Sequence, residues 1–97
     1  NIIIPEGIEN ICPFVFINQK KLKEIHFPDS LREIGERAFE GCTNLRKIVL
    51  PNSLTELRNG AFYYCKNIRN VDLSTNLKKI PEECFRDCNL NTYPKAK

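Results

Sequence analysis

Residues 45–67 read LRKIVLPNSLTELRNGAFYYCKN, and the residues before them, 22–44, read LKEIHFPDSLREIGERAFEGCTN. Residues 68–89 read IRNVDLSTNLKKIPEECFRDCN, one residue short of the same pattern, and residues 2–21 fit its register. A fixed period of this length is typical of a solenoid, in which each repeat buries its apolar side only against neighbouring repeats. The period therefore predicts one array of about four coils. Their expected bounds are 1–21, 22–44, 45–67 and 68–89, with residues 90–97 as the fraying start of a fifth coil.

Apolar and variable residues alternate within one stretch of each repeat. Ile48 and Leu50 fall in columns of apolar residues, whereas Val49 between them falls in a column of no shared character. Alternation with a period of two predicts a short strand with two inward columns and one outward column, and stacking would pair these strands into a parallel sheet. Pro51 ends the strand because proline cannot donate to a ladder. The inward columns are Ile2, Ile25, Ile48, Val71 and Tyr93, and Ile4, Phe27, Leu50 and Leu73; the outward column is Ile3, His26, Val49 and Asp72.

The rest of each repeat supplies turns and further core residues. A short polar residue after the proline, such as Ser30 or Ser53, is expected to hydrogen-bond the turn backbone of its own or the next coil. One phenylalanine per repeat predicts a stacked aromatic column. The segment 36–42 is expected to form a short helical turn. The apolar pairs are Ile8/Ile11, Leu31/Ile34, Leu54/Leu57 and Leu77/Ile80, and then Val15-Phe16, Ala38-Phe39, Ala61-Phe62 and Cys84-Phe85.

Three of the five cysteines, Cys42, Cys65 and Cys88, occupy one column. Their spacing follows the repeat and the total is odd, which does not suit a bridged disulfide framework. We expect a ladder of buried free thiols that act as small hydrophobic residues. Cys84 takes the place of an alanine in other repeats, and no histidine lies near it in the sequence, so we expect no metal site.

Length and composition indicate one domain of ordinary apolar content. The formal net charge of +3 is mild and does not by itself indicate nucleic-acid binding. No apolar run approaches the length of a membrane span, and no signal peptide is visible. The chain contains no methionine. We therefore expect a processed product or a segment of a longer array.

The pattern LxxIxLPxSLxxIxxxAFxxCxxL resembles the leucine-rich repeats of the BspA-like, Treponema pallidum-type class. The matching residues are Leu22, Ile25, Phe27, Pro28, Ser30, Leu31, Ile34, Ala38, Phe39 and Cys42, and Leu45, Ile48, Leu50, Pro51, Ser53, Leu54, Leu57, Ala61, Phe62 and Cys65. The resemblance implies an α/β fold, a right-handed leucine-rich-repeat solenoid with a parallel sheet on the concave side and short helical turns and short strands elsewhere. It also implies a surface or secreted protein that adheres to or binds other proteins. The free-thiol pattern leaves a cytoplasmic location as the alternative.

Residues of catalytic type do not form a recognisable set. His26 is the only histidine, and it falls in the outward column, away from the cysteine column. There is no glycine-rich phosphate loop. We therefore expect no enzyme activity and no cofactor.

Two surfaces are candidates for binding. The first is the outward strand face, whose columns are the least uniform: Ile3, Glu24, His26, Lys47, Val49, Asn70 and Asp72. The second is a basic rim in the loops that enter the strands: Lys20, Lys21, Lys23, Arg46, Lys66 and Arg69. The first predicts a non-catalytic protein-interaction module. The alternatives are a structural spacer in a longer repeat protein, and binding of an acidic protein or polyanionic glycan through the rim. No nucleic acid is expected, because the rim lacks interleaved aromatic residues. End-to-end self-association is expected from unsealed strand edges.

Overall fold

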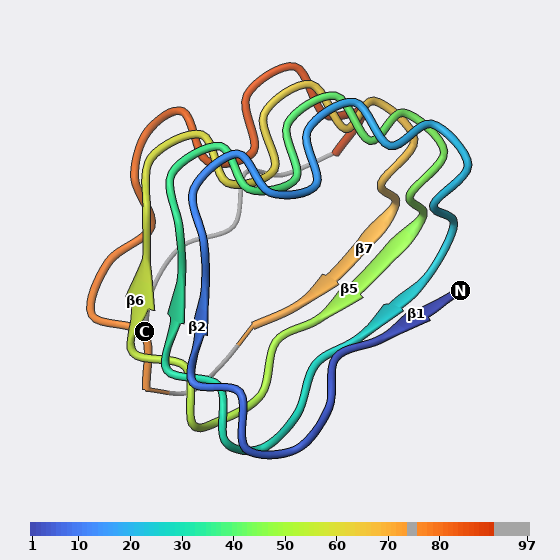
Figure 1. Ribbon diagram of the computed structural model, residues 1–97. Coiled ribbons are helices and arrows are strands. Elements are labelled where there is room, and N and C mark those ends of the chain that lie inside the picture. Colours follow the sequence, from blue (N-terminus) through green and yellow to red (C-terminus); the bar gives the residue numbers. More distant parts are fainter. Residues whose placement is uncertain (74–75, 91–97) are drawn as a thin grey trace.

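The computed structural model describes residues 1–73 and 76–90 (Figure 1). Four strands carry the predicted alternating stretch: β1 (Ile2–Ile3), β3 (Ile25–His26), β5 (Lys47–Val49) and β7 (Asn70–Asp72). Strand β1 pairs in parallel with β3, and β5 with β7, and a single parallel bridge between Glu24 and Lys47 links the two pairs. Every pairing joins residues that are 23 apart, such as Ile48 and Val71. The register predicted from the repeat is confirmed; Tyr93 and residues 91–97 lie outside the described residues.

A second parallel sheet covers another side of the molecule. It consists of β2 (Asn10–Ile11), β4 (Glu33–Ile34) and β6 (Glu56–Leu57), in that order. The amide of Gly35 donates to the carbonyl of Ile11 at 2.8 Å, and the amide of Arg58 donates to the carbonyl of Ile34 at 3.0 Å. In the fourth repeat this position is Pro81, which has no amide hydrogen to donate. No fourth strand joins this sheet in the part of the chain that the structure describes, and the segment of residues 76–81, orange at the left of Figure 1, runs outside β6.

Phenylalanine rings stack through the centre of the molecule, as the sequence predicted. The Phe16 and Phe39 rings lie 5.2 Å apart, the Phe39 and Phe62 rings 5.3 Å, and the Phe62 and Phe85 rings 5.4 Å, with planes within 11° of parallel. Phe39 and Phe62 have no exposed surface. The aliphatic residues of the inward columns surround these rings. One aromatic column therefore joins neighbouring repeats into one core.

Polar side chains tie the turns of neighbouring repeats together. The Ser30 hydroxyl accepts from the amide of Gly7 at 2.9 Å and donates to the carbonyl of Ile8 at 2.8 Å. The Ser53 hydroxyl donates to the carbonyl of Leu31. The predicted hydrogen bonding of this column to turn backbone is confirmed, but the partners lie in the preceding repeat and not in the same or the next one.

The expected helical turn over residues 36–42 is wrong. The described residues contain no helix, and this segment is a series of turns. Arg37 (φ 52°) and Gly41 (φ 75°) adopt left-handed backbone, which a right-handed helix cannot contain. Alternate amides of this segment also donate to the next repeat: Phe39 donates to the carbonyl of Ala61 at 2.8 Å, and Gly41 donates to that of Tyr63 at 2.9 Å. The neighbouring repeat thus takes the hydrogen bonds that a helix would need.

The first repeat departs from the predicted core. Ile8 and Val15 were expected to be buried, but 41% of the surface of Ile8 and 48% of that of Val15 are exposed. Phe14 beside them is 48% exposed. The reason is that each repeat is covered on two sides by its neighbours, and the first described repeat has such a neighbour on one side only.

Candidate functional site

The strand face of β1, β3, β5 and β7 presents two exposed columns of side chains. In one column Ile3 lies opposite His26, and Val49 lies opposite Asp72. In the other Glu24 lies opposite Lys47, which lies opposite Asn70. All seven of these side chains are exposed, while Ile25 and Ile48 between them point into the core. The structure thus brings the predicted strand-face residues together on one surface.

Apolar and charged residues are mixed on this strand face. Ile3 is 73% exposed and Val49 is 45% exposed, so each offers an apolar side chain that the core does not need. Lys47 lies two residues from Val49 on the same strand, and its side chain is exposed. Ile3 and Val49 each lie on a strand that is paired in parallel with one neighbour, β1 with β3 and β5 with β7, which holds their backbone in place. This combination suits a protein contact better than a small-molecule site.

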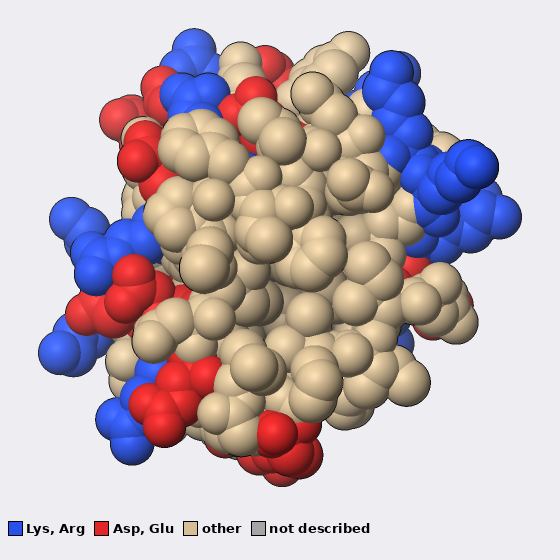
Figure 2. All heavy atoms as spheres, viewed as in Figure 1, with Lys and Arg blue, Asp and Glu red and all other residues tan. Residues whose placement is uncertain are grey.

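The basic rim adjoins the strand face. Its predicted members are all exposed: Lys20, Lys21, Lys23, Arg46, Lys66 and Arg69. Figure 2 shows Lys and Arg gathered near the loops that lead into β3, β5 and β7, at the right of the view, whereas at the left they alternate with Asp and Glu. Two asparagines that the sequence argument missed hold these loops. Asn44 donates to the carbonyl of Lys20, and Asn67 donates to that of Thr43 at 2.6 Å.

Arginines on the turns of residues 35–41, 58–64 and 81–87 have acidic partners. The Arg37 guanidinium lies 2.8 Å from a Glu40 carboxylate oxygen and 5.5 Å from the centre of the Tyr63 ring. Its hydrogen bond to Glu40 and the charge of that carboxylate raise the pKa of Arg37. Arg86 lies 3.1 Å from Glu83. These charges neutralise one another within the protein, so this surface is a weaker candidate for binding an ion.

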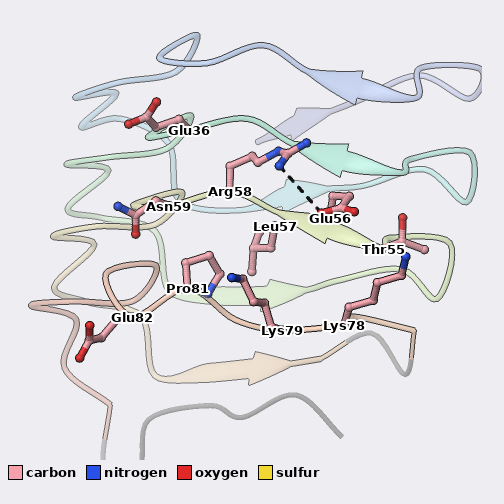
Figure 3. Close-up of a pocket in the computed structure, with 10 residues that line it drawn as sticks. All are labelled: Glu36, Thr55, Glu56, Leu57, Arg58, Asn59, Lys78, Lys79, Pro81 and Glu82. Atoms are coloured by element: carbon pink, nitrogen blue, oxygen red, sulfur yellow. Dashed lines mark ion pairs between the residues drawn. The ribbon is translucent and has the colours of Figure 1, made fainter.

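An open groove of about 540 Å³ lies where the second sheet ends at β6 (Figure 3). The sequence argument did not find this groove, which lies beside Pro81, a residue that has no amide hydrogen to extend the second sheet. Arg58 contacts Glu33 at 2.9 Å and Glu56 at 4.0 Å, and the first contact raises the pKa of Arg58. The lining residues include no histidine, serine or cysteine and do not form a nucleophile–base set. They are Glu36, Thr55, Glu56, Leu57, Arg58, Asn59, Lys78, Lys79, Pro81 and Glu82.

The cysteine column consists of free thiols, as predicted, and each thiol bonds to a neighbouring repeat; Cys42 and Cys65 are buried, as expected, whereas Cys88 is only half-buried. The Cys42 thiol donates to the carbonyl of Phe16 at 3.2 Å, and the Cys65 thiol to that of Phe39 at 3.0 Å. Burial raises the pKa of Cys84 to about 12 and that of Cys88 to about 11. Such thiols stay protonated and unreactive at neutral pH, which indicates a structural role.

Among the described residues, no three His, Cys, Asp or Glu side chains are placed to hold a metal ion. The part of the chain that the structure describes also has no helix long and apolar enough to cross a membrane.

Comparison with known proteins identifies the family. The model of the BspA type leucine rich repeat region matches residues 1–95 in six copies. The chain therefore belongs to the BspA-type leucine-rich-repeat family, which confirms the resemblance seen in the sequence. Proteins of this class are typically non-catalytic, and leucine-rich repeats generally mediate protein–protein interaction. No curated protein matches the sequence.

Three solved structures share the fold. A T. pallidum leucine-rich-repeat protein is 36% identical, with a TM-score of 0.87, and the match covers 90% of this chain and 41% of that one. A leucine-rich-repeat protein from Bacteroides ovatus is 33% identical, with a TM-score of 0.82, over 86% of this chain and 22% of that one. A leucine rich cell surface protein from Faecalibacterium prausnitzii is 22% identical, with a TM-score of 0.78, over 94% and 32%. The chain thus spans less than half the length of each.

Proposed function

We propose that this chain is a non-catalytic, adhesion-type module that binds a partner protein through the strand face of β1, β3, β5 and β7. The observation that supports this most is the exposure of Ile3 and Val49 on paired strands whose alternate residues form the core. Val49 would be the apolar anchor, with Lys47 and Asp72 beside it to set orientation through charge. Glu24, His26 and Asn70 complete the proposed contact surface.

The proposal includes the architecture and the location. We take the chain as a right-handed solenoid of about four coils with this face concave, because a concave face lets one partner touch several repeats at once. We assign it to a cell surface or to the secreted fraction, in keeping with the family. The five free cysteines support the alternative, a reducing cytoplasm. Fractionation of the source cells, followed by detection of the protein, decides between these locations.

The binding test compares variants of one strand-face residue. Wild-type protein, Val49→Glu and the conservative control Val49→Ile are measured on a biosensor against a panel of purified extracellular-matrix and serum glycoproteins. For a protein that wild type binds, Val49→Glu should weaken binding by at least about tenfold, because it places a charge in a desolvated contact. Val49→Ile should bind as wild type does. Thr55→Glu, in the groove beside β6, controls for added charge elsewhere.

The outcome also separates the alternatives. All variants should unfold at nearly the same denaturant concentration, since Val49 lies outside the core. If the panel shows no binding, or if binding survives Val49→Glu, the interaction proposal fails for this segment. The spacer function then takes its place.

A further inference from the structure

A column of three cations runs along the basic rim, and no carboxylate of the described residues forms an ion pair with them. Lys23, Arg46 and Arg69 occupy equivalent positions in neighbouring repeats. The amide of Arg46 donates to the carbonyl of Lys23 at 3.3 Å, and the amide of Arg69 donates to that of Arg46 at 2.8 Å. Their backbones are therefore direct neighbours across the strands, about 5 Å apart from one to the next. Like charges in this arrangement repel each other.

On the second sheet, two like charges on neighbouring strands are neutralised by a side chain of the protein itself. Glu33 and Glu56 are paired in register on β4 and β6, just as Arg46 and Arg69 are stacked on the rim. Arg58 lies between them, 2.9 Å from Glu33 and 4.0 Å from Glu56. Among the described residues no carboxylate lies within 4.0 Å of the charged groups of Lys23, Arg46 or Arg69. Within the part of the chain that the structure describes, these three cations thus lack the counterion that the paired glutamates have.

Two open depressions lie along this column of cations. Arg46 and Arg69 line an open depression of about 310 Å³ together with Asn67. Lys23 and Arg46 line a second one of about 280 Å³, with Glu24 and Lys47. Arg46 belongs to both, so the depressions are adjacent along the rim. Asn44 and Asn67 fix the loops on which the cations stand, which lowers the entropy lost when an anion binds.

We infer that the column of Lys23, Arg46 and Arg69 binds a linear sulfated polysaccharide, with Arg46 at the centre of the site. Sulfate groups accept charge-assisted hydrogen bonds from guanidinium and ammonium groups, and a linear polymer can place them along successive repeats. The rim offers no apolar anchor of the kind that a protein partner needs. Among the described residues it also offers no exposed aromatic ring on which a nucleic-acid base could stack, since those that are exposed there, Phe14 and Tyr64, belong to the turn segments.

The test measures binding of a sulfated heparin oligosaccharide to the 97-residue chain by titration calorimetry. Arg46→Ala should weaken binding by about tenfold, the loss expected for one charge-assisted hydrogen bond. Arg46→Ala with Arg69→Ala should weaken it by about a hundredfold, and affinity should fall steeply from about 50 to about 300 mM salt. Glu24→Gln should strengthen binding, because Glu24 lines the depression shared by Lys23 and Arg46.

Matched controls separate this site from net charge and from the strand face. Arg32→Ala removes the same charge from an exposed arginine in the turn before β4 and should change binding by less than about twofold. Val49→Ser, which removes the proposed apolar anchor without adding a charge, should also leave glycan binding unchanged. Failure of the protein-binding proposal would therefore not affect this one. Thermal unfolding of each variant checks that it is folded.

Three results would overturn the inference. One is a wild-type affinity for the desulfated oligosaccharide equal to that for the sulfated one. Another is an equal loss in Arg32→Ala and Arg46→Ala, which would indicate non-specific charge attraction. The third is tighter binding of duplex DNA or polyglutamate than of the sulfated chain, which would assign the rim to a nucleic acid or to an acidic protein.

Discussion

Replacing Phe62 with alanine tests the aromatic column on which the fold depends. The Phe62 ring has no exposed surface and stacks on Phe39 at 5.3 Å and on Phe85 at 5.4 Å. Truncating a buried phenylalanine to alanine lowers the free energy of unfolding by about 3–5 kcal/mol. Each stacked pair adds about 0.5–1.5 kcal/mol beyond the buried area, and Phe62→Ala removes two. We therefore expect a loss in the upper half of that range, about 4–5 kcal/mol.

Phe16 provides the matched comparison within the same column. It stacks on one ring only, Phe39, at 5.2 Å, and it is partly exposed. Phe16→Ala removes less buried area and one pair instead of two, so its loss should be about 2 kcal/mol. Phe62→Leu keeps most of the volume and should lose less than Phe62→Ala. The order of the three losses thus follows from the number of neighbours that each ring has.

The assay is urea unfolding followed by far-UV circular dichroism and by tyrosine fluorescence, since the chain has no tryptophan. With an m-value of about 1.5 kcal/mol per M, a loss of about 4 kcal/mol lowers the midpoint by roughly 2.7 M. The two probes must give the same transition, because repeat arrays can unfold in parts. A loss below about 1 kcal/mol for Phe62→Ala, or a loss for Phe16→Ala as large as that for Phe62→Ala, would refute the reasoning.

Two further predictions concern the thiols and the ends of the array. Burial raises the pKa of Cys84 to about 12, whereas the same thiol in the unfolded chain ionises from about pH 9. The folded protein therefore keeps this contribution to its stability below pH 9 and loses it as the pH rises toward 12. By pH 10 the free energy of unfolding should have fallen by about 1.4 kcal/mol. Cys84→Ala, which restores the alanine of other repeats, should remove this loss. Equal losses in wild type and Cys84→Ala between pH 7 and pH 10 would contradict the assignment. The exposed apolar residues Ile8, Phe14 and Val15 of the first repeat should cause weak self-association. Light scattering should show a mass that rises with concentration for wild type and not for Val15→Lys, whereas a wild-type monomer at about millimolar concentration would contradict this.

The columns of the fold could be predicted from the sequence because the repeat makes every residue the neighbour of its counterpart 23 positions away. That rule alone predicts that Phe39 packs on Phe62, that Ile48 lies beside Val71 and that Val49 faces outward. The repeat also predicted that Ser30 would hydrogen-bond the backbone of a turn. The same rule selected the strand face and the basic rim, since exposed columns are the ones without a shared apolar character.

The helical turn could not be excluded from the sequence. The run from Glu36 to Cys42 contains good helix formers, and its local pattern does not show where its amides bond. Donation from Phe39 to the carbonyl of Ala61, in the next repeat, decides against a helix. A hydrogen bond across repeats depends on the position of a whole neighbouring segment, and local propensity carries no information about it.

The sequence by itself determined the family, the repeat period, the inward and outward columns and the absence of a recognisable catalytic motif. Only the tertiary structure decided which charges neutralise one another and which do not. Arg58, which follows β6, reaches Glu33 on the neighbouring strand β4, whereas Arg46 has no such partner among the described residues. Only the structure also showed that Pro81 ends the second sheet and leaves a groove there. The reason is that burial follows from a residue's own column, but ion pairs and grooves depend on where side chains of different columns and repeats come to lie.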